Sequence, residues 1–172
     1  MFENLGLAAP ASWFATGAFA AGGLAALILA TPPADRLASA LTSVPPRLGA
    51  FRALQQSPAK LIAGIAIAWL LGGFLEEIVF RAMLLRWIET HAGLPMPAAS
   101  ILAIAGAAAG AGIVHLYQGP RGALIVAQLS VLFGLVYVLS GHDLWSVILC
   151  HGAYDTIAFV RFARGKSKYA GM

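Results

Sequence analysis

The sequence predicts an all-α fold, a polytopic transmembrane helical bundle of about five spanning helices that forms a single membrane domain over residues 1–172. Hydrophobic residues make up 60% of the chain and charged residues only 10%, whereas an ordinary soluble domain has roughly 25% charged residues. A spanning helix needs roughly 20 apolar residues. The apolar residues are grouped accordingly, in long uncharged runs at 4–34, 61–75, 96–114, 122–139 and 144–154.

The first predicted crossing, residues 11–30, is rich in Ala and Gly, small residues that let transmembrane helices approach closely. Because proline lacks a backbone N–H and disfavours a continuing helix, Thr31-Pro32-Pro33 is predicted to end this crossing. The stretch 31–58 is polar and interrupted by proline, which predicts an extramembrane linker or an interfacial helix.

The second crossing is predicted to begin near Ala59 and to run toward Trp87. Turn residues at 93–97, 119–121 and 140–143 then delimit the third, fourth and fifth crossings. Lys and Arg are concentrated in the linker, the second of these turns and the C-terminal tail. The positive-inside rule therefore predicts an outer N-terminus and a cytoplasmic C-terminus.

Charge and cysteine content exclude two classes of protein. The formal net charge is +4, but the basic residues are spread over the predicted loops and form no compact basic module, so no nucleic-acid partner is expected. Cys150 is the single cysteine, which excludes an intrachain disulfide framework and a Cys-rich zinc site.

Two adjacent carboxylates interrupt the second crossing. A charge within a membrane helix is costly unless it is paired or hydrated, and it indicates a functional site. Arg81 lies one helical turn after Glu77 on the same face, so these two residues are predicted to pair, either as a structural ion pair or as part of a site. Glu76 points about 100° away from Glu77 and has no basic residue three or four positions away. Its partner is therefore expected on another helix.

Histidines supply the remaining candidates. His115 ends the third apolar run, where a lone histidine is more often structural than catalytic. His151 and Asp155 are four positions apart, so they share a helix face, and the carboxylate could orient the imidazole. An inert buried hydrogen bond is the alternative for this pair. His91 and His142 lie in predicted turns and are expected to be solvated.

Carboxylates and imidazoles on three helices suit hydrolysis by an activated water molecule. A carboxylate can take a proton from water, an imidazole can share it, and further donors can hold an oxyanion. The zinc-peptidase motif with two histidines flanking a glutamate on one helix is absent from the sequence. A zinc ion held by Glu76, His115 and His151 from three helices stays open as an alternative.

Three short motifs occur in a characteristic order: Glu-Glu-Ile-Val-Phe-Arg at 76–81, His115, and His-Gly-Ala-Tyr-Asp at 151–155. They resemble the EExxxR motif, the second-motif histidine and the HxxxN or HxxxD motif of the CAAX protease and bacteriocin-processing family of intramembrane proteases, also called CPBP or Abi. The resemblance covers residues 72–155, the expected catalytic core. It implies a multi-pass protein of a bacterial or archaeal cell membrane.

The resemblance also implies roles for the charged residues of the second crossing. Glu76 would be the general base that activates water, with His115 assisting, while Glu77 and Arg81 would support the site. No cofactor is expected, with zinc as the alternative. The second motif usually has Phe four residues before its histidine, a position that holds Ala111 here.

In the third motif, His151 and Asp155 would line the oxyanion side of the site. The family more often has Asn at the position of Asp155, and an ionised carboxylate would repel an oxyanion. Asp155 is therefore expected to be protonated or to orient His151. Glu76 and His115 present a geometric conflict, because a helix that starts near Ala59 at the inner membrane face would carry Glu76 roughly 25 Å across, far from the inner end of the third crossing.

The sequence thus predicts an intramembrane endopeptidase that hydrolyses a peptide bond of a membrane-anchored protein or peptide. Two other classes fit the intramembrane charges: a proton-coupled carrier with Glu76 and His115 as a relay, and a catalytically silent immunity or scaffold protein of the same fold. Five crossings are few for the resembled family, so a partner subunit or a homo-oligomer is expected to complete the cavity.

Overall fold

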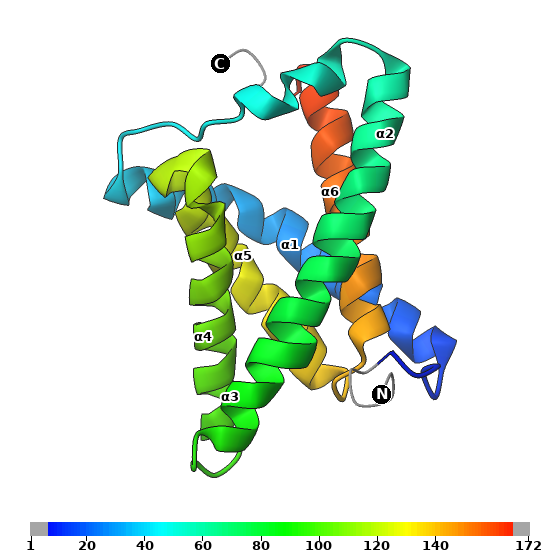
Figure 1. Cartoon of the computed structure of the whole chain (residues 1–172), viewed down its shortest axis with the longest axis vertical. Helices are drawn as coiled ribbons and strands as arrows, with labels where there is room; N and C mark the ends of the chain where they lie inside the picture. The colour runs from blue at the N-terminus through cyan, green and yellow to red at the C-terminus, as the bar shows by residue number, and fades with distance from the viewer. Residues whose placement is uncertain (1–6, 167–172) are drawn as a thin grey trace.

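The computed structural model describes residues 7–166, and within this range every regular element is helical, which confirms the all-α prediction (Figure 1). The six α-helices are α1 (Trp13–Leu41), α2 (Pro58–Ala68), α3 (Arg86–His91), α4 (Ala98–Val114), α5 (Gly119–Leu139) and α6 (Leu144–Ala163). Two π-helical stretches, η3 (Trp69–Glu76) and η4 (Ile78–Leu85), join α2 to α3 into one long helix. Short 3-10 helices precede α2 and follow α4, namely η2 (Gly49–Gln55) and η5 (His115–Gln118).

Among residues 7–166, three helical stretches are long and apolar enough to cross a membrane: Trp13–Leu41, Pro58–His91 and Ala98–Leu139. The third stretch reverses direction at Gly119, whose positive φ of 84° suits glycine, so that α4 and α5 form an antiparallel hairpin (Figure 1). The 20 residues of α6 add a helix of roughly 30 Å. This arrangement is consistent with about five spanning helices.

Large apolar side chains cover the outside of the bundle. Phe14 is 88% exposed, Leu29 76% and Leu139 68%. An exposed apolar surface of this extent would favour association in water, whereas lipid tails solvate it. Trp13 and Trp87 are also exposed, near helix ends, as is typical of aromatic residues at the membrane interface. These features support an integral membrane protein.

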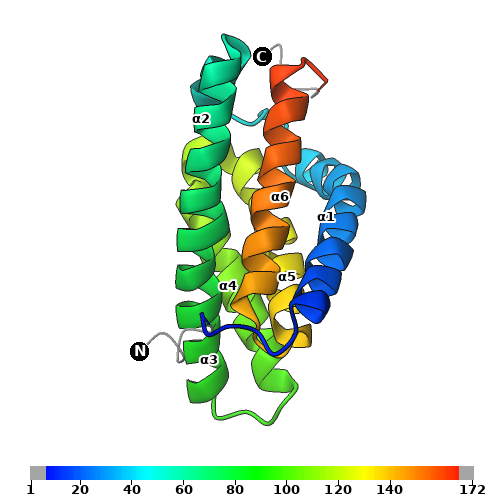
Figure 2. The same cartoon turned by 90° about the vertical axis from the view of Figure 1, so that its right-hand side faces the viewer.

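The buried face of α1 explains how this helix joins the bundle. In the first half of α1 the buried residues Thr16, Ala20, Gly23 and Leu27 recur every three or four positions, and the helix packs against α5 and α6. Gly23 permits the closest approach, since a Cβ at this position would lie 2.6 Å from the Val136 side chain and 3.0 Å from the Cys150 sulfur. α5 in turn contacts α1, α4 and α6, so it occupies the centre of the structure (Figures 1 and 2).

The predicted helix end at Thr31-Pro32-Pro33 is wrong, because both prolines lie inside α1, which continues to Leu41. The segment between the first two long helices therefore begins at Thr42 and not at Thr31. Membrane helices tolerate proline where neighbouring elements support the chain. Here the second half of α1 is held by an ion pair from Asp35 to Arg121 of α5, with 2.9 Å between Oδ1 and Nη2. Figure 2 shows that α1 changes direction in this half.

The predicted conflict between the positions of Glu76 and His115 depended on placing the start of the second crossing level with the end of the third. In both views α2 begins well beyond the turn between α4 and α5 (Figures 1 and 2). The long helix therefore reaches the level of that turn only partway along its length. Glu76, near the middle of the stretch Pro58–His91, lies within reach of the end of α4.

Candidate active site

The π-helical part of the long helix carries the two adjacent glutamates. Glu76 is the last residue of η3, and Glu77 lies between η3 and η4. η3 packs against α6, whereas η4 packs against α4, so the glutamates lie where the helix changes its neighbour. Interruptions of α-helical geometry of this kind are frequent at functional sites.

Glu76 faces the end of α4, so its partner lies on another helix, as the sequence predicted. Its Oε1 lies 3.8 Å from Nε2 of His115, and the two side chains are 30% and 12% exposed. His115 Nδ1 lies 2.8 Å from the carbonyl oxygen of Ala111. Since a carbonyl only accepts, Nδ1 carries the proton of this hydrogen bond. In a neutral imidazole Nε2 is then an acceptor that faces a carboxylate oxygen.

When His115 is neutral, its Nε2 and the Glu76 oxygen are two acceptors 3.8 Å apart, which cannot share a direct hydrogen bond. A water molecule that donates one hydrogen to each group fits this arrangement. The resembled motif usually has Phe where this chain has Ala111. This position contacts His115 through its backbone carbonyl oxygen, which any residue supplies.

Glu77 is fully buried, and its carboxylate contacts a different helix, α6. Its Oε1 lies 2.5 Å from Nδ1 of His151 on α6, and its Oε2 lies 3.1 Å from Nε of Arg81. Arg81 also donates to Ser130 of α5, with 2.6 Å from Nη2 to Oγ and 3.1 Å to the carbonyl oxygen. This chain of contacts ties the long helix to α5 and α6, and it fixes the imidazole through Nδ1.

His151 is therefore oriented by Glu77. The sequence predicts that Asp155 is protonated or orients His151, and the structure gives the orienting hydrogen bond to Glu77. The Nε2 of His151 lies 3.6 Å from Oδ2 of Asp155, which is too long for a hydrogen bond. Phe133 of α5 stacks on the imidazole, with 4.4 Å between ring centroids and 26° between planes. The ring is thus held on one edge and one face, and its Nε2 faces the Asp155 carboxylate without a hydrogen bond to it.

The structure brings the candidates from three helices into one region in two contacts, Glu76 with His115 and Glu77 with His151. Within the described residues, no group of three or more His, Cys, Asp or Glu is arranged to hold a metal ion. The alternative zinc ligands Glu76, His115 and His151 are thus not gathered into such a group. Nδ1 of His151 is engaged by Glu77, and its Nε2 faces Asp155.

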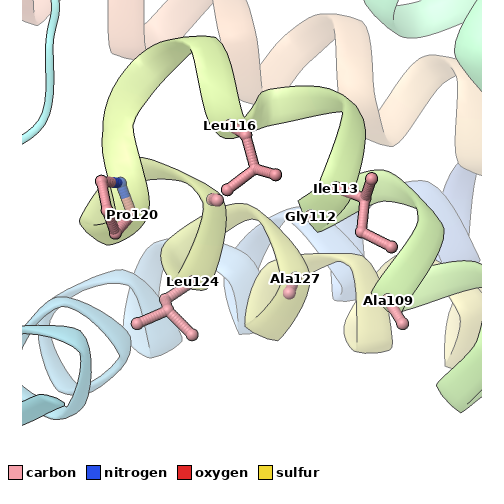
Figure 3. Close-up of a pocket in the computed structure, with 8 residues that line it drawn as sticks. Ala109, Gly112, Ile113, Leu116, Pro120, Leu124 and Ala127 are labelled. Atoms are coloured by element: carbon pink, nitrogen blue, oxygen red, sulfur yellow. The ribbon is translucent and has the colours of Figure 1, made fainter.

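A hollow of the described structure lies elsewhere, between α4 and the start of α5 (Figure 3). It has a volume of about 350 Å³ and is lined by Ala109, Gly112, Ile113, Leu116, Pro120, Ala123, Leu124 and Ala127. These residues offer no titratable side chain. The ionisable candidates around Glu76 and His151 thus lie outside this hollow.

A second polar cluster, at the far end of the long helix, was not anticipated. Glu89 accepts hydrogen bonds from Ser100 Oγ at 2.5 Å and Arg86 Nη1 at 2.9 Å, and it pairs with His142 Nε2 at 3.0 Å. The prediction that His142 is solvated is wrong, because it is half-buried against this cluster, and burial together with the nearby Arg86 lowers its pKa. The three-residue spacing of Arg86 and Glu89 was an available signal. His91 is exposed, as predicted.

The model of one protein family, the type II CAAX prenyl endopeptidase Rce1-like family, matches residues 58–157. Searches of curated proteins and of solved structures gave no match. The matched range covers more than half of the chain and contains both contacts of the site. At the level of the family, it implies CAAX-type intramembrane protease activity. The chain therefore belongs to the Rce1-like type II CAAX prenyl endopeptidase family, which is the CAAX protease and bacteriocin-processing family predicted from its motifs.

Proposed function

We propose that this protein is an intramembrane endopeptidase in which Glu76 activates a water molecule for attack on a peptide bond. The observation that carries this proposal is the pair of facing acceptors, Glu76 Oε1 and His115 Nε2, 3.8 Å apart. A water molecule between them would donate to both and present a lone pair outward. Such a carboxylate–water–imidazole arrangement is what general-base hydrolysis requires.

In the proposed reaction the water oxygen bonds to the scissile carbonyl carbon while Glu76 takes a proton. The carbonyl oxygen becomes an oxyanion that Nε2–H of a protonated His151 would stabilise, because Glu77 holds the opposite nitrogen of the ring. When the carbon–nitrogen bond breaks, the proton passes from Glu76 to the leaving amine. We propose that Asp155 is either protonated or ionised and paired with the imidazolium of His151, because an ionised carboxylate without such a partner would repel the oxyanion.

The proposed substrate is a membrane-anchored protein or peptide. The site lies among helices with apolar outer surfaces, so a substrate that is already held in the bilayer would reach it by lateral diffusion. The family's description names a CAAX prenyl endopeptidase, which favours cleavage near a lipid-modified C-terminus over cleavage at a leader boundary. We propose a metal-free mechanism, with water as the nucleophile and Glu76 as the base.

The test is cleavage of C-terminal prenyl-peptides by the purified protein in proteoliposomes. The Glu76→Gln variant should lose at least about 10²-fold in kcat, the lower range for removing a general base. Glu89→Gln changes a carboxylate in the distant cluster and is the matched control, which should retain activity. Activity that survives metal stripping and a chelator supports the metal-free mechanism, whereas loss restored by Zn²⁺ would replace it.

Three outcomes would overturn the proposal. Cleavage that is undiminished in Glu76→Gln would remove Glu76 from the chemistry. Proton-coupled solute flux without any peptide cleavage would favour the carrier alternative, and neither flux nor cleavage would favour a silent immunity or scaffold protein.

A further inference from the structure

The packing of η3 on α6 depends on glycines from both helices. Gly152 of α6 leaves room for the indole of Trp69, since a Cβ on Gly152 would lie only about 2.4 Å from ring atoms of this side chain. Trp69 Nε1 also donates to Oγ1 of Thr156 at 3.0 Å. The tryptophan therefore sets the register between the two helices.

Gly72 lies one turn of η3 before Glu76 and faces the catalytic side chains of α6 directly. A Cβ on Gly72 would lie 2.9 Å from Oδ2 of Asp155 and 3.4 Å from Nε2 of His151. The first distance is shorter than real Cβ contacts, so one of the groups would have to shift. The atom that can move is the end of a flexible side chain, the Asp155 carboxylate.

From these contacts we propose that Gly72 is a positioning residue of the active site, whose missing side chain lets the Asp155 carboxylate take its place beside Nε2 of His151. This inference rests on the proposed function and extends it to a position that no catalytic motif contains. A methyl group at Gly72 would displace the Asp155 carboxylate by several tenths of an ångström from its place beside Nε2. Misplacement by about 1 Å can reduce a reaction rate by roughly 10².

The neighbouring Gly73 provides a matched control. The three atoms nearest to its Cβ would all belong to the backbone of α6, with Gly152 N and Cα at 3.4 Å and the Ile148 carbonyl oxygen at 3.5 Å. Gly72→Ala and Gly73→Ala share the same gain in helix propensity and the same helix–helix contact. They differ in whether the added methyl group touches Asp155.

The experiment compares these two variants in the prenyl-peptide assay, beside wild type and Glu76→Gln, and measures kcat, KM and Tm. We expect Gly72→Ala to lower kcat at least tenfold with KM within about twofold and Tm within about 3 °C of wild type. Gly73→Ala should keep kcat within about threefold, whatever its Tm. In an Asp155→Ala background the shorter side chain leaves room for the methyl group, so Gly72→Ala should cause no further loss of kcat. In an isosteric Asp155→Asn background the side chain keeps its size, so Gly72→Ala should still lower kcat.

Wild-type kcat in Gly72→Ala would overturn the inference, as would a joint collapse of kcat and Tm, which would mean a structural role only. An equal further loss in the Asp155→Ala background would also contradict it. Failure of the proposed function has a different signature, because it appears as unchanged cleavage in Glu76→Gln or as no cleavage by wild type.

Discussion

The buried ion pair of Arg81 permits a quantitative test of how the site is held. The Arg81 and Glu77 side chains are only 2% and 0% exposed. The Arg81→Met variant keeps most of the side-chain volume but leaves the Glu77 carboxylate with His151 as its remaining charged partner. Breaking a buried pair from one side costs about 3–5 kcal/mol. At about 2–4 °C per kcal/mol for a chain of this size, Tm should fall by roughly 6–20 °C.

The single cysteine gives a convenient assay for this loss. Cys150 is 1% exposed and free, so a thiol-reactive dye should label it only as the protein unfolds in detergent. Ser130→Ala is a graded comparison, because it removes the hydroxyl acceptor of Arg81 but keeps the carbonyl acceptor. Its Tm should fall by less than that of Arg81→Met. A melting temperature for Arg81→Met within 2 °C of wild type would refute the reasoning that this pair holds the helices together.

Three further predictions concern packing and pH. Replacing Phe133 by Leu removes the ring stacked on His151 and should lower kcat by up to about tenfold, since such a contact contributes about 0.5–1.5 kcal/mol. Gly152→Ala forces a methyl group into the Trp69 ring and should destabilise the protein by about 1–3 kcal/mol, measured by thermal unfolding. The pKa of His142 is lowered in the folded state, so as the pH falls the unfolded chain protonates this imidazole before the folded protein does. The free energy of unfolding should therefore decrease as the pH drops below about 6.5 toward the folded pKa.

Each of these predictions has a clear contrary result. Unchanged kcat in Phe133→Leu would mean that Glu77 alone orients His151. If Gly152→Ala is as stable as wild type, the indole of Trp69 can move away, and the register argument fails. A His142→Gln variant should lose the acid-dependent part of its Tm profile, and an identical pH profile in this variant would assign that dependence to other groups.

The sequence was sufficient for the fold class. The motif resemblance paired Glu76 with His115, whereas the predicted helix boundaries placed these two residues far apart, and the structure has them 3.8 Å apart. Long uncharged runs report burial in lipid, a property that depends on composition more than on detailed packing. The predicted helix end at Pro32-Pro33 was wrong because the course of α1 depends on tertiary packing and not on composition. Proline weakens the local backbone, but the Asp35 ion pair to Arg121 is a tertiary contact, and no local pattern reveals which loop an acidic residue will meet.

The role of Glu77 shows the same limit at the site. Spacing of four positions correctly predicted the ion pair to Arg81 and the shared face of His151 and Asp155. It could not predict that the hydrogen bond to His151 comes from another helix, because this depends on how closely η3 approaches α6. That approach is controlled by Gly72 and Gly152, residues without any chemical group of their own.

The structure explains why two glutamates are adjacent in the sequence. Neighbouring residues on a helix point about 100° apart, so a single Glu-Glu pair can serve two partners that lie on different helices. Glu76 meets His115 at the end of α4, and Glu77 meets His151 within α6. Exposure then separates their chemistry: the 30% exposed Glu76 can exchange protons with water, whereas the fully buried Glu77 is committed to Arg81 and His151. If this division is correct, Glu77→Gln should lower both Tm and kcat, whereas Glu76→Gln should lower kcat alone, and a large fall in Tm for Glu76→Gln would contradict it.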